Sequence, residues 1–166
     1  MTSTQSTPSD KPVFVGVDHV SWTVPDLDAA VRFYVDVFGA AEVYRMGPID
    51  AADIPLDEHG RDWMQTHVNV PGACLSIAML KLAPNLNFEL FQYDKPADRS
   101  SALPRNCDRG GHHIAIKVDD VDKAARYLKA NGCTVLETIV MEQGPLAGKK
   151  NVYFLDPWGH QLELVD

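Results

Sequence analysis

The chain has 166 residues, 45% of them hydrophobic and 23% charged, which is typical of a globular protein with one domain or two small modules around a shared core. Its formal net charge of −8 argues against nucleic acid and anionic membranes as partners, because phosphate groups are bound by clustered cations. No apolar stretch approaches the roughly 20 residues that a membrane-spanning helix needs.

The beginning of the chain is predicted to be a tail. Residues 1–12 are rich in Ser, Thr and Pro and lack the apolar stretch of a signal peptide, so we expect a disordered tail on a cytoplasmic protein. The three cysteines, Cys74, Cys107 and Cys133, are widely spaced and odd in number. That pattern predicts buried or incidental thiols and supports neither a disulfide framework nor a structural zinc site.

The first part of the chain, residues 13–100, is predicted to form a β-α-β-β-β module. Residues 13–24 alternate between polar and apolar side chains, which indicates a strand. The carboxylates that follow suit a helix N-terminus, apolar residues continue at helical spacing to Phe38, and Gly39 is placed to end the helix. Further strands are predicted at residues 42–45, 73–82 and 86–91.

The second part of the chain repeats this plan. Residues 18–34 return as residues 112–128 with an offset of 94, and His, Val, Asp, Ala and Arg recur at matching positions. A repeat of this kind indicates a duplicated structural unit. After a linker at residues 101–111, a second module over residues 112–166 is therefore predicted. Its expected elements are a strand at 112–118, a helix at 120–130 capped near Gly132, and strands at 134–140, 151–155 and 161–165.

The two modules differ in length. His19 and Glu89 are 70 residues apart, whereas His113 and Glu163 are 50 residues apart. The first module therefore carries about 20 additional residues, which we place within residues 46–72, where loop signals are mixed with a possible short helix. This insertion is either a lid or substrate-facing loop, or a plain elaboration of the surface.

Four residues are candidates for a metal site. His19, Glu89, His113 and Glu163 each lie opposite the aliphatic side chains of their strands, so they share the face that turns away from the helices. Two imidazoles and two carboxylates would converge if both sheets curve around one cavity, and they would form a mixed nitrogen and oxygen site for one divalent ion. Zinc, nickel, cobalt, manganese and ferrous iron all suit such donors. The modules could pair within one chain or across a homodimer, and a homodimer is expected.

Three motifs give the chain a family resemblance: residues 18–27 (DHVSWTVPDL), 111–120 (GHHIAIKVDD) and 154–164 (FLDPWGHQLEL). With them the chain, from residue 13 to residue 166, resembles the vicinal oxygen chelate superfamily, which includes glyoxalase I, methylmalonyl-CoA epimerase, extradiol dioxygenases and fosfomycin-resistance proteins. The resemblance implies an α+β fold in which two βαβββ modules, with mixed sheets, form an open barrel-like cavity. It also implies a divalent metal that chelates two adjacent oxygens of a small-molecule substrate.

The resemblance also implies which residues bind the metal. It places ligands at His19, Glu89, His113 and Glu163; His112 is the alternative to His113, although only His113 matches His19 under the offset of 94. The remaining histidines have no matching partner in the other module, and we expect them to be solvated or to support the ligands from outside. They are His59, His67 and His160.

A fourth ligand at Glu89 favours chemistry like that of glyoxalase I or the epimerase. In both, the metal polarises an oxygen and a carboxylate moves a proton on the carbon beside a carbonyl. We predict an isomerase, lyase or epimerase of this kind, with Glu163 as the general base and Glu89 as the alternative. Such an enzyme would be cytoplasmic and would need no cofactor besides the metal ion.

Two other functions stay open at this point. His19, His113 and Glu163 alone would suffice for a ring-cleaving extradiol-type dioxygenase, and a non-catalytic protein that sequesters a ligand is the second alternative. The identity of the substrate is not encoded in a recognisable motif. The only adjacent basic pair, Lys149 and Lys150, could contact a CoA ester, and the aromatic residues Trp22, Trp63 and Phe91 could contact an aromatic compound.

Overall fold

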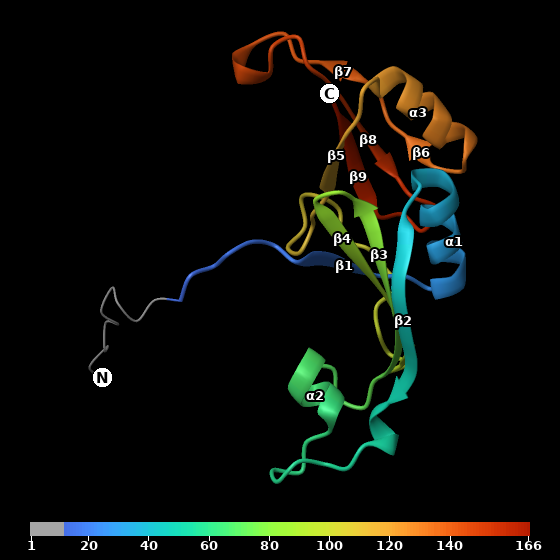
Figure 1. Ribbon diagram of the computed structural model, residues 1–166, viewed down its shortest axis with the longest axis vertical. Helices are drawn as coiled ribbons and strands as arrows, with labels where there is room; N and C mark the ends of the chain where they lie inside the picture. The colour runs from blue at the N-terminus through green and yellow to red at the C-terminus, as the bar shows by residue number, and fades with distance from the viewer. Residues whose placement is uncertain (1–11) are drawn as a thin grey trace.

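The computed structural model describes residues 12–166 (Figure 1). The predicted tail lies outside the described residues except for Pro12. The α+β fold class is confirmed: the strands form two sheets, each with parallel and antiparallel pairs, and few helices accompany them. No helix within the described part of the chain has the length and apolar character required to cross a membrane.

The first sheet contains strands β1 (His19–Thr23), β2 (Ala41–Asp50), β3 (Cys74–Ala83) and β4 (Leu86–Lys95) in the order β1-β4-β3-β2. β1 runs parallel to β4, and the other neighbours are antiparallel. The strand predicted at residues 13–24 was too long, because β4 begins at Leu86 and offers residues 12–18 no backbone partner. β2 and β4 are longer than predicted because the ten-residue β3 pairs with both along most of its length.

Helix α1 (Leu27–Phe38) follows β1, as predicted. The Asp26 carboxylate accepts a hydrogen bond from the backbone N–H of Ala29 and caps the first turn, as Asp commonly does at this position. At the other end Gly39 has a φ of 69°, a left-handed conformation that favours glycine and ends the helix. The buried face of α1 consists of Leu27, Ala30, Val31 and Tyr34.

The second sheet contains β5 (Ile114–Lys117), β6 (Thr134–Val135), β8 (Lys150–Leu155) and β9 (Gln161–Val165) in the order β5-β9-β8-β6, and β7 (Ile139–Val140) also pairs with β8. Helix α3 (Val121–Ala130) follows β5. The strand predicted at 134–140 is divided into β6 and β7, because the two pair with separate parts of β8. The strand predicted at 112–118 is shorter, because its pairing with β9 begins at Ile114.

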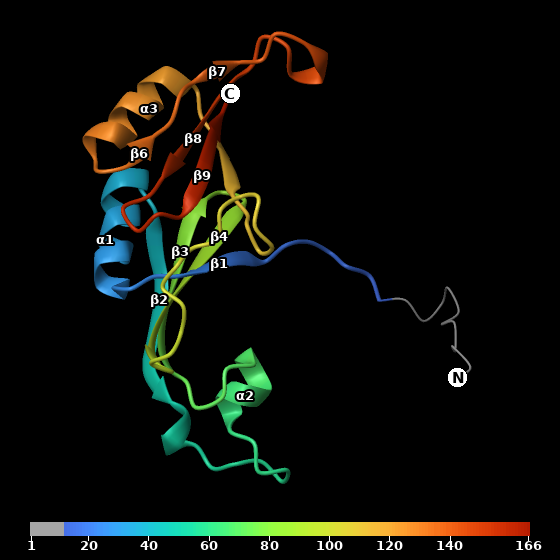
Figure 2. The same ribbon diagram turned by 180° about the vertical axis from the view of Figure 1, so that it is seen from behind.

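One apolar core serves both modules. Helices α1 and α3 lie next to each other along one side of the molecule, as both views show (Figures 1 and 2). The buried side chains beneath them come from α1, α3 and the facing strands; those from the strands include Trp22, Phe88, Leu90, Phe154 and Leu162. Burial of such side chains is the main favourable contribution to folding. The two modules therefore fold onto each other rather than as separate units.

The insertion forms a second, smaller core on the opposite face of the first sheet. It contains a 3₁₀ turn (Ala51–Asp53) and helix α2 (Trp63–Val68), which lies at the end of the molecule away from α3 (Figure 1). Met64 of α2 is fully buried among Ala51, Ala73 and Leu75. These side chains pack with Ile77, Phe91 and Tyr93, which alternate with the residues that face α1.

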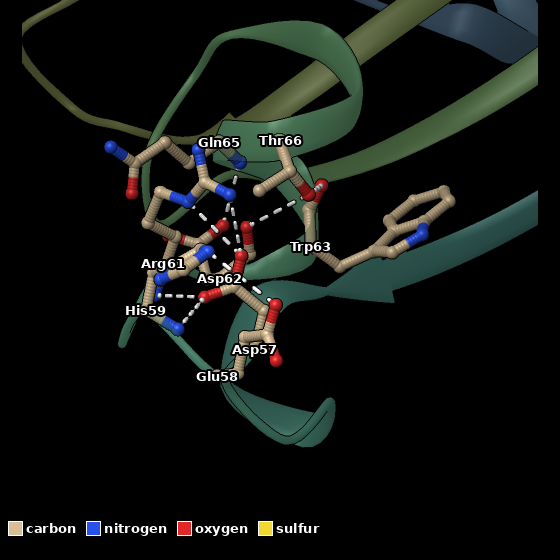
Figure 3. Close-up of polar contacts among 8 residues, drawn as sticks. All are labelled: Asp57, Glu58, His59, Arg61, Asp62, Trp63, Gln65 and Thr66. Carbon is tan, nitrogen blue, oxygen red and sulfur yellow. Dashed lines mark hydrogen bonds and ion pairs between the residues drawn. The ribbon is translucent and has the colours of Figure 1, made fainter.

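The loop before α2 is held by local hydrogen bonds (Figure 3). The Asp57 carboxylate accepts hydrogen bonds from the backbone N–H groups of His59 and Arg61 and pairs with the Arg61 guanidinium at 2.9 Å. Asp62 caps α2 by accepting from the Gln65 N–H, and its second oxygen accepts from the Gly72 N–H. These backbone hydrogen bonds lower the pKa of both aspartates, so the loop keeps its shape with charged carboxylates.

Candidate metal centre

The first histidine and glutamate lie on neighbouring strands of the first sheet. Ser21 of β1 is the register partner of Glu89 on β4, so His19 lies two residues away on the same face. Its Nε2 is 3.3 Å from Glu89 Oε2, and its Nδ1 is 2.8 Å from Asp18 Oδ1. A carboxylate bound to one ring nitrogen orients the imidazole and leaves the other nitrogen for a metal. Asp18 therefore turns Nε2 of His19 toward Glu89.

The second pair has almost the same geometry. Ala115 of β5 is the register partner of Glu163 on β9, and His113 lies two residues before Ala115. His113 Nε2 is 3.4 Å from Glu163 Oε2. Since Ala115 matches Ser21 under the 94-residue offset, the duplicated sequence produces a duplicated histidine–glutamate pair. We call the pairs His19–Glu89 and His113–Glu163 the two half-sites.

The structure brings each histidine to its glutamate, but it leaves the half-sites on separate sheets. Across residues 12–166, no group of three or more His, Cys, Asp or Glu side chains is close enough to hold one ion. Convergence of all four ligands therefore stays a prediction. The placement of each pair on one face follows from strand alternation, whereas the distance between pairs depends on how the modules pack.

The donor chemistry of the half-sites fits a divalent cation. The side chains of Glu89 and Glu163 are only 13% and 12% exposed. Among the described residues, the ion-pair partner of each glutamate is a histidine, and no lysine or arginine pairs with either. Carboxylates in so little contact with water usually have a positive partner. An imidazole nitrogen beside each carboxylate is also the mixed donor set that zinc, manganese and related ions accept.

The contacts of His112 favour His113 as the predicted ligand. His112 Nε2 accepts a hydrogen bond from the Trp22 indole N–H at 2.8 Å, and Nδ1 lies 3.0 Å from the Gly110 carbonyl. The tautomer that satisfies both contacts carries its proton on Nδ1. Both ring nitrogens of His112 are therefore occupied, which leaves no lone pair for a metal, and the alternative ligand is not supported.

Sequence reasoning overlooked Tyr153. Its hydroxyl lies 3.5 Å from His113 Nε2, its ring meets the imidazole edge to face at 5.0 Å, and its backbone is the register partner of Glu163. Burial and then the nearby Glu163 raise the pKa of Tyr153, so the phenol keeps its proton and can donate it in a hydrogen bond. The signal was available: strand alternation places Tyr153 on the face of Glu163. Met79 is the corresponding register partner of Glu89 in the first sheet.

The other histidines lie away from both half-sites. His59 is exposed beside Glu58, and His67 stacks on Trp63 with ring centroids 4.5 Å apart. His160, in contrast, is buried between the modules: Nδ1 is 3.0 Å from Asp156 Oδ2 and Nε2 is 3.1 Å from the Thr23 carbonyl. His160 is therefore a buried residue that joins the two modules, and the expectation of a solvated side chain is wrong for it.

The remaining candidates for substrate contact differ in where they lie and in what they contact. Trp22 is buried in the shared core and so lies on the opposite face of the first sheet from Glu89, whereas Phe91 shares the face of Glu89 and packs against the insertion. The insertion therefore lies on the ligand face of this sheet, which favours the substrate-facing interpretation over a plain surface elaboration. Lys149 and Lys150 pair with Asp166 and Asp122, respectively, which weakens the case for contacts with a CoA ester.

The cysteines do not contribute to the site. All three are free; Cys74 and Cys133 are buried, and Cys107 is exposed. Burial raises the pKa of the Cys133 thiol to about 11, which makes a reactive thiolate unfavourable at neutral pH. Cys74 and Cys133 are thus buried thiols, as predicted, and Cys107 is an incidental exposed one.

The family follows from comparison with known proteins. The family model described as the Glyoxalase/Bleomycin resistance protein/Dioxygenase superfamily matches residues 16–164. The chain belongs to this superfamily. The match includes both half-sites and the insertion, so it extends over both modules. The resemblance seen in the three sequence motifs is thereby confirmed.

Several curated relatives are epimerases. The chain is 48% identical over 160 residues to a 2-epi-5-epi-valiolone epimerase from Actinomyces sp., covering 93% of this chain and 81% of that protein. It is 32% identical over 145 residues to the mitochondrial methylmalonyl-CoA epimerase of Bos taurus, covering 85% of this chain and 66% of that protein. These relatives support an enzyme of this superfamily.

A solved structure confirms the superfamily fold. A glyoxalase family protein from Bacillus cereus superimposes with a TM-score of 0.70 over 94% of this chain and 96% of its own length. The sequences are only 19% identical, so the likeness concerns the fold rather than the reaction.

Proposed function

We propose that this protein is a divalent-metal-dependent epimerase, or a closely related isomerase or lyase, that moves a proton on the carbon beside a carbonyl of a small substrate. The observation that carries this proposal is the matched pair of half-sites, each with an imidazole that is a little over one-third exposed and a nearly buried carboxylate. The 48% identity to a 2-epi-5-epi-valiolone epimerase supports epimerisation and makes that compound the first substrate to test.

In this proposal His19, His113 and the two glutamates hold the metal. When bound, the ion supplies Lewis-acid assistance by stabilising the negative charge that develops on the substrate oxygen. Asp18 holds the His19 ring in orientation. The Tyr153 hydroxyl lies 3.5 Å from His113 Nε2, and with that nitrogen bound to the metal it can donate its hydrogen bond to a substrate oxygen instead.

Glu163 removes the proton from the substrate carbon, and Glu89 is the alternative base. An epimerase has to return a proton to the opposite side of the same carbon. The duplicated module supplies a second carboxyl group of the same kind and similar exposure. In its acid form that group can return a proton to the opposite side while Glu163 takes one, so that the protons balance.

The test is proton exchange in D₂O. Purified protein with Mn²⁺ or Co²⁺ should introduce deuterium beside the carbonyl of 2-epi-5-epi-valiolone, detected by NMR, and chelation should stop the exchange. Absence of exchange with every divalent ion tested would contradict the proposal for this substrate. Oxygen uptake with a catechol would instead support the dioxygenase alternative. Tight binding of a compound without turnover would support the sequestering alternative.

Tyr153→Phe tests the hydroxyl beside His113. The substitution keeps the ring and removes one hydrogen bond, so we expect kcat to fall about tenfold, the effect of a lost hydrogen bond of ordinary strength. Steady-state kinetics and Mn²⁺ titration measure the effect, with little change expected in metal affinity. Tyr127→Phe on α3, where the ring is 48% exposed, is the matched control. A Tyr153→Phe enzyme with the wild-type kcat would remove this hydroxyl from the reaction.

A further inference from the structure

The two half-sites lie in different sheets, and the contacts that join these sheets involve side chains. β1 carries His19 in the first sheet, and His113 directly precedes β5 in the second. In the described part of the chain, no strand of one sheet is hydrogen-bonded to a strand of the other. Backbone pairing therefore fixes each half-site internally but does not fix one relative to the other. Their separation has to be set by contacts that cross between the modules.

Six residues make the polar contacts at this crossing: Trp22, Thr23 and Tyr34 from the first module and His112, Asp156 and His160 from the second. We call them the junction cluster. Trp22 donates its indole N–H to His112 Nε2 at 2.8 Å and stacks on His160 at 4.8 Å with an interplanar angle of 3°. In the sequence Trp22 lies three residues after His19, and His112 immediately precedes His113.

The rest of the cluster is rigid because its groups are buried and satisfied. The two ring nitrogens of His160 lie within hydrogen-bond distance of Asp156 Oδ2, at 3.0 Å, and of the Thr23 carbonyl, at 3.1 Å. Asp156 also accepts from the Tyr34 hydroxyl at 2.9 Å and from two backbone N–H groups. No buried side-chain nitrogen or oxygen within residues 12–166 lacks a partner.

We propose that Trp22 and His112 are positioning residues that set the separation of the two half-sites, on which the sharing of one metal ion depends. The inference rests on the proposed function. Its physical basis is that His112 is held at both ring nitrogens, by Trp22 and by the Gly110 carbonyl, and its backbone continues directly into His113. Movement of His112 therefore moves His113 relative to β1.

The experiment compares Mn²⁺ affinity among variants of the full chain. Trp22→Phe keeps an aromatic ring but removes the N–H donor, and His112→Ala removes the acceptor. Each should weaken Mn²⁺ binding at least about tenfold, the usual loss when a group that supports a ligand is removed. The double variant should lose no more than the larger single loss, because both substitutions break one contact. His112→Gln, whose amide oxygen can accept the indole N–H, should recover much of the affinity.

Matched controls separate positioning from stability. Trp158→Phe alters another tryptophan that packs between the modules, against Phe33 at 5.5 Å, and His59→Ala alters an exposed histidine. Both should leave Mn²⁺ affinity and the absorption spectrum of the Co²⁺ protein unchanged, although Trp158→Phe lowers the melting temperature. Metal-free melting curves for all variants show which of them fold. If Trp22→Phe does not fold, the comparison of His112→Ala with His112→Gln decides.

The outcomes distinguish the two proposals. A wild-type protein that binds neither Mn²⁺ nor Co²⁺ overturns the metal-dependent function, and the positioning role with it. A wild-type protein that binds metal, with Trp22→Phe and His112→Ala variants that bind equally well, overturns only the positioning role. Weaker binding in both variants, non-additivity in the double variant and recovery with His112→Gln support it.

Discussion

Replacing Glu163 with glutamine is expected to stop proton exchange while the protein stays folded. The amide has nearly the shape of the carboxylate but cannot accept the substrate proton, and loss of a general base lowers kcat by a factor of about 10²–10⁴. Because Glu163 is also a predicted ligand, beside His113 Nε2 at 3.4 Å, we expect Mn²⁺ affinity to fall as well. The rate of deuterium incorporation at saturating Mn²⁺ measures the effect on proton transfer apart from the effect on binding.

Two comparisons make this prediction specific. Glu89→Gln should weaken Mn²⁺ binding and retain more exchange than Glu163→Gln if Glu163 is the base; the reverse order would assign that role to Glu89. Unchanged Mn²⁺ affinity in Glu89→Gln would remove Glu89 from the ligands. Glu142→Gln, at an exposed position in the second module, controls for the loss of one negative charge. Exchange in Glu163→Gln close to the wild-type rate would contradict the predicted role.

Replacing Asp156 with alanine is expected to cause the largest loss of stability, although Asp156 lies outside the half-sites. The carboxylate is buried and has four hydrogen-bond partners: the Tyr34 hydroxyl, the His160 ring and the backbone N–H groups of Trp158 and His160. Removal of one partner of a buried pair costs about 3–5 kcal/mol, because the remaining groups stay buried without a partner. Urea unfolding without metal measures the change in the free energy of unfolding.

The neighbouring groups show why the loss should be large. Burial, followed by the adjacent Asp156 carboxylate, raises the pKa of Tyr34 well above its ordinary value, so the phenol keeps its proton and needs an acceptor. Asp156→Asn retains the shape and one acceptor oxygen and should lose less than Asp156→Ala. Asp108→Ala breaks the exposed pair with Arg105 and should have only a small effect. Equal effects of Asp108→Ala and Asp156→Ala would contradict the importance of burial.

Much of the fold was predictable because its signals are local. The alternation of residues 19–24, the carboxylates before α1 and the repeat between residues 18–34 and 112–128 depend on neighbours in the sequence. Strand ends were less predictable because they depend on a partner strand. Residues 13–18 have the pattern of a strand but lie beyond the start of β4, and residues 136–138 interrupt the predicted strand between β6 and β7.

In the candidate site, too, some features follow from local sequence and others depend on distant partners. The sequence alone determined the identity of the two histidine–glutamate pairs, because strand alternation places each pair on one face and the duplication repeats it. Only the tertiary structure decided that His112 is occupied by Trp22, that Tyr153 reaches His113, and that His160 is buried against Asp156. These contacts join residues as far apart as Trp22 and His112, 90 positions along the chain. Their geometry depends on how two separately formed sheets pack around one core, which periodicity within either sheet does not specify.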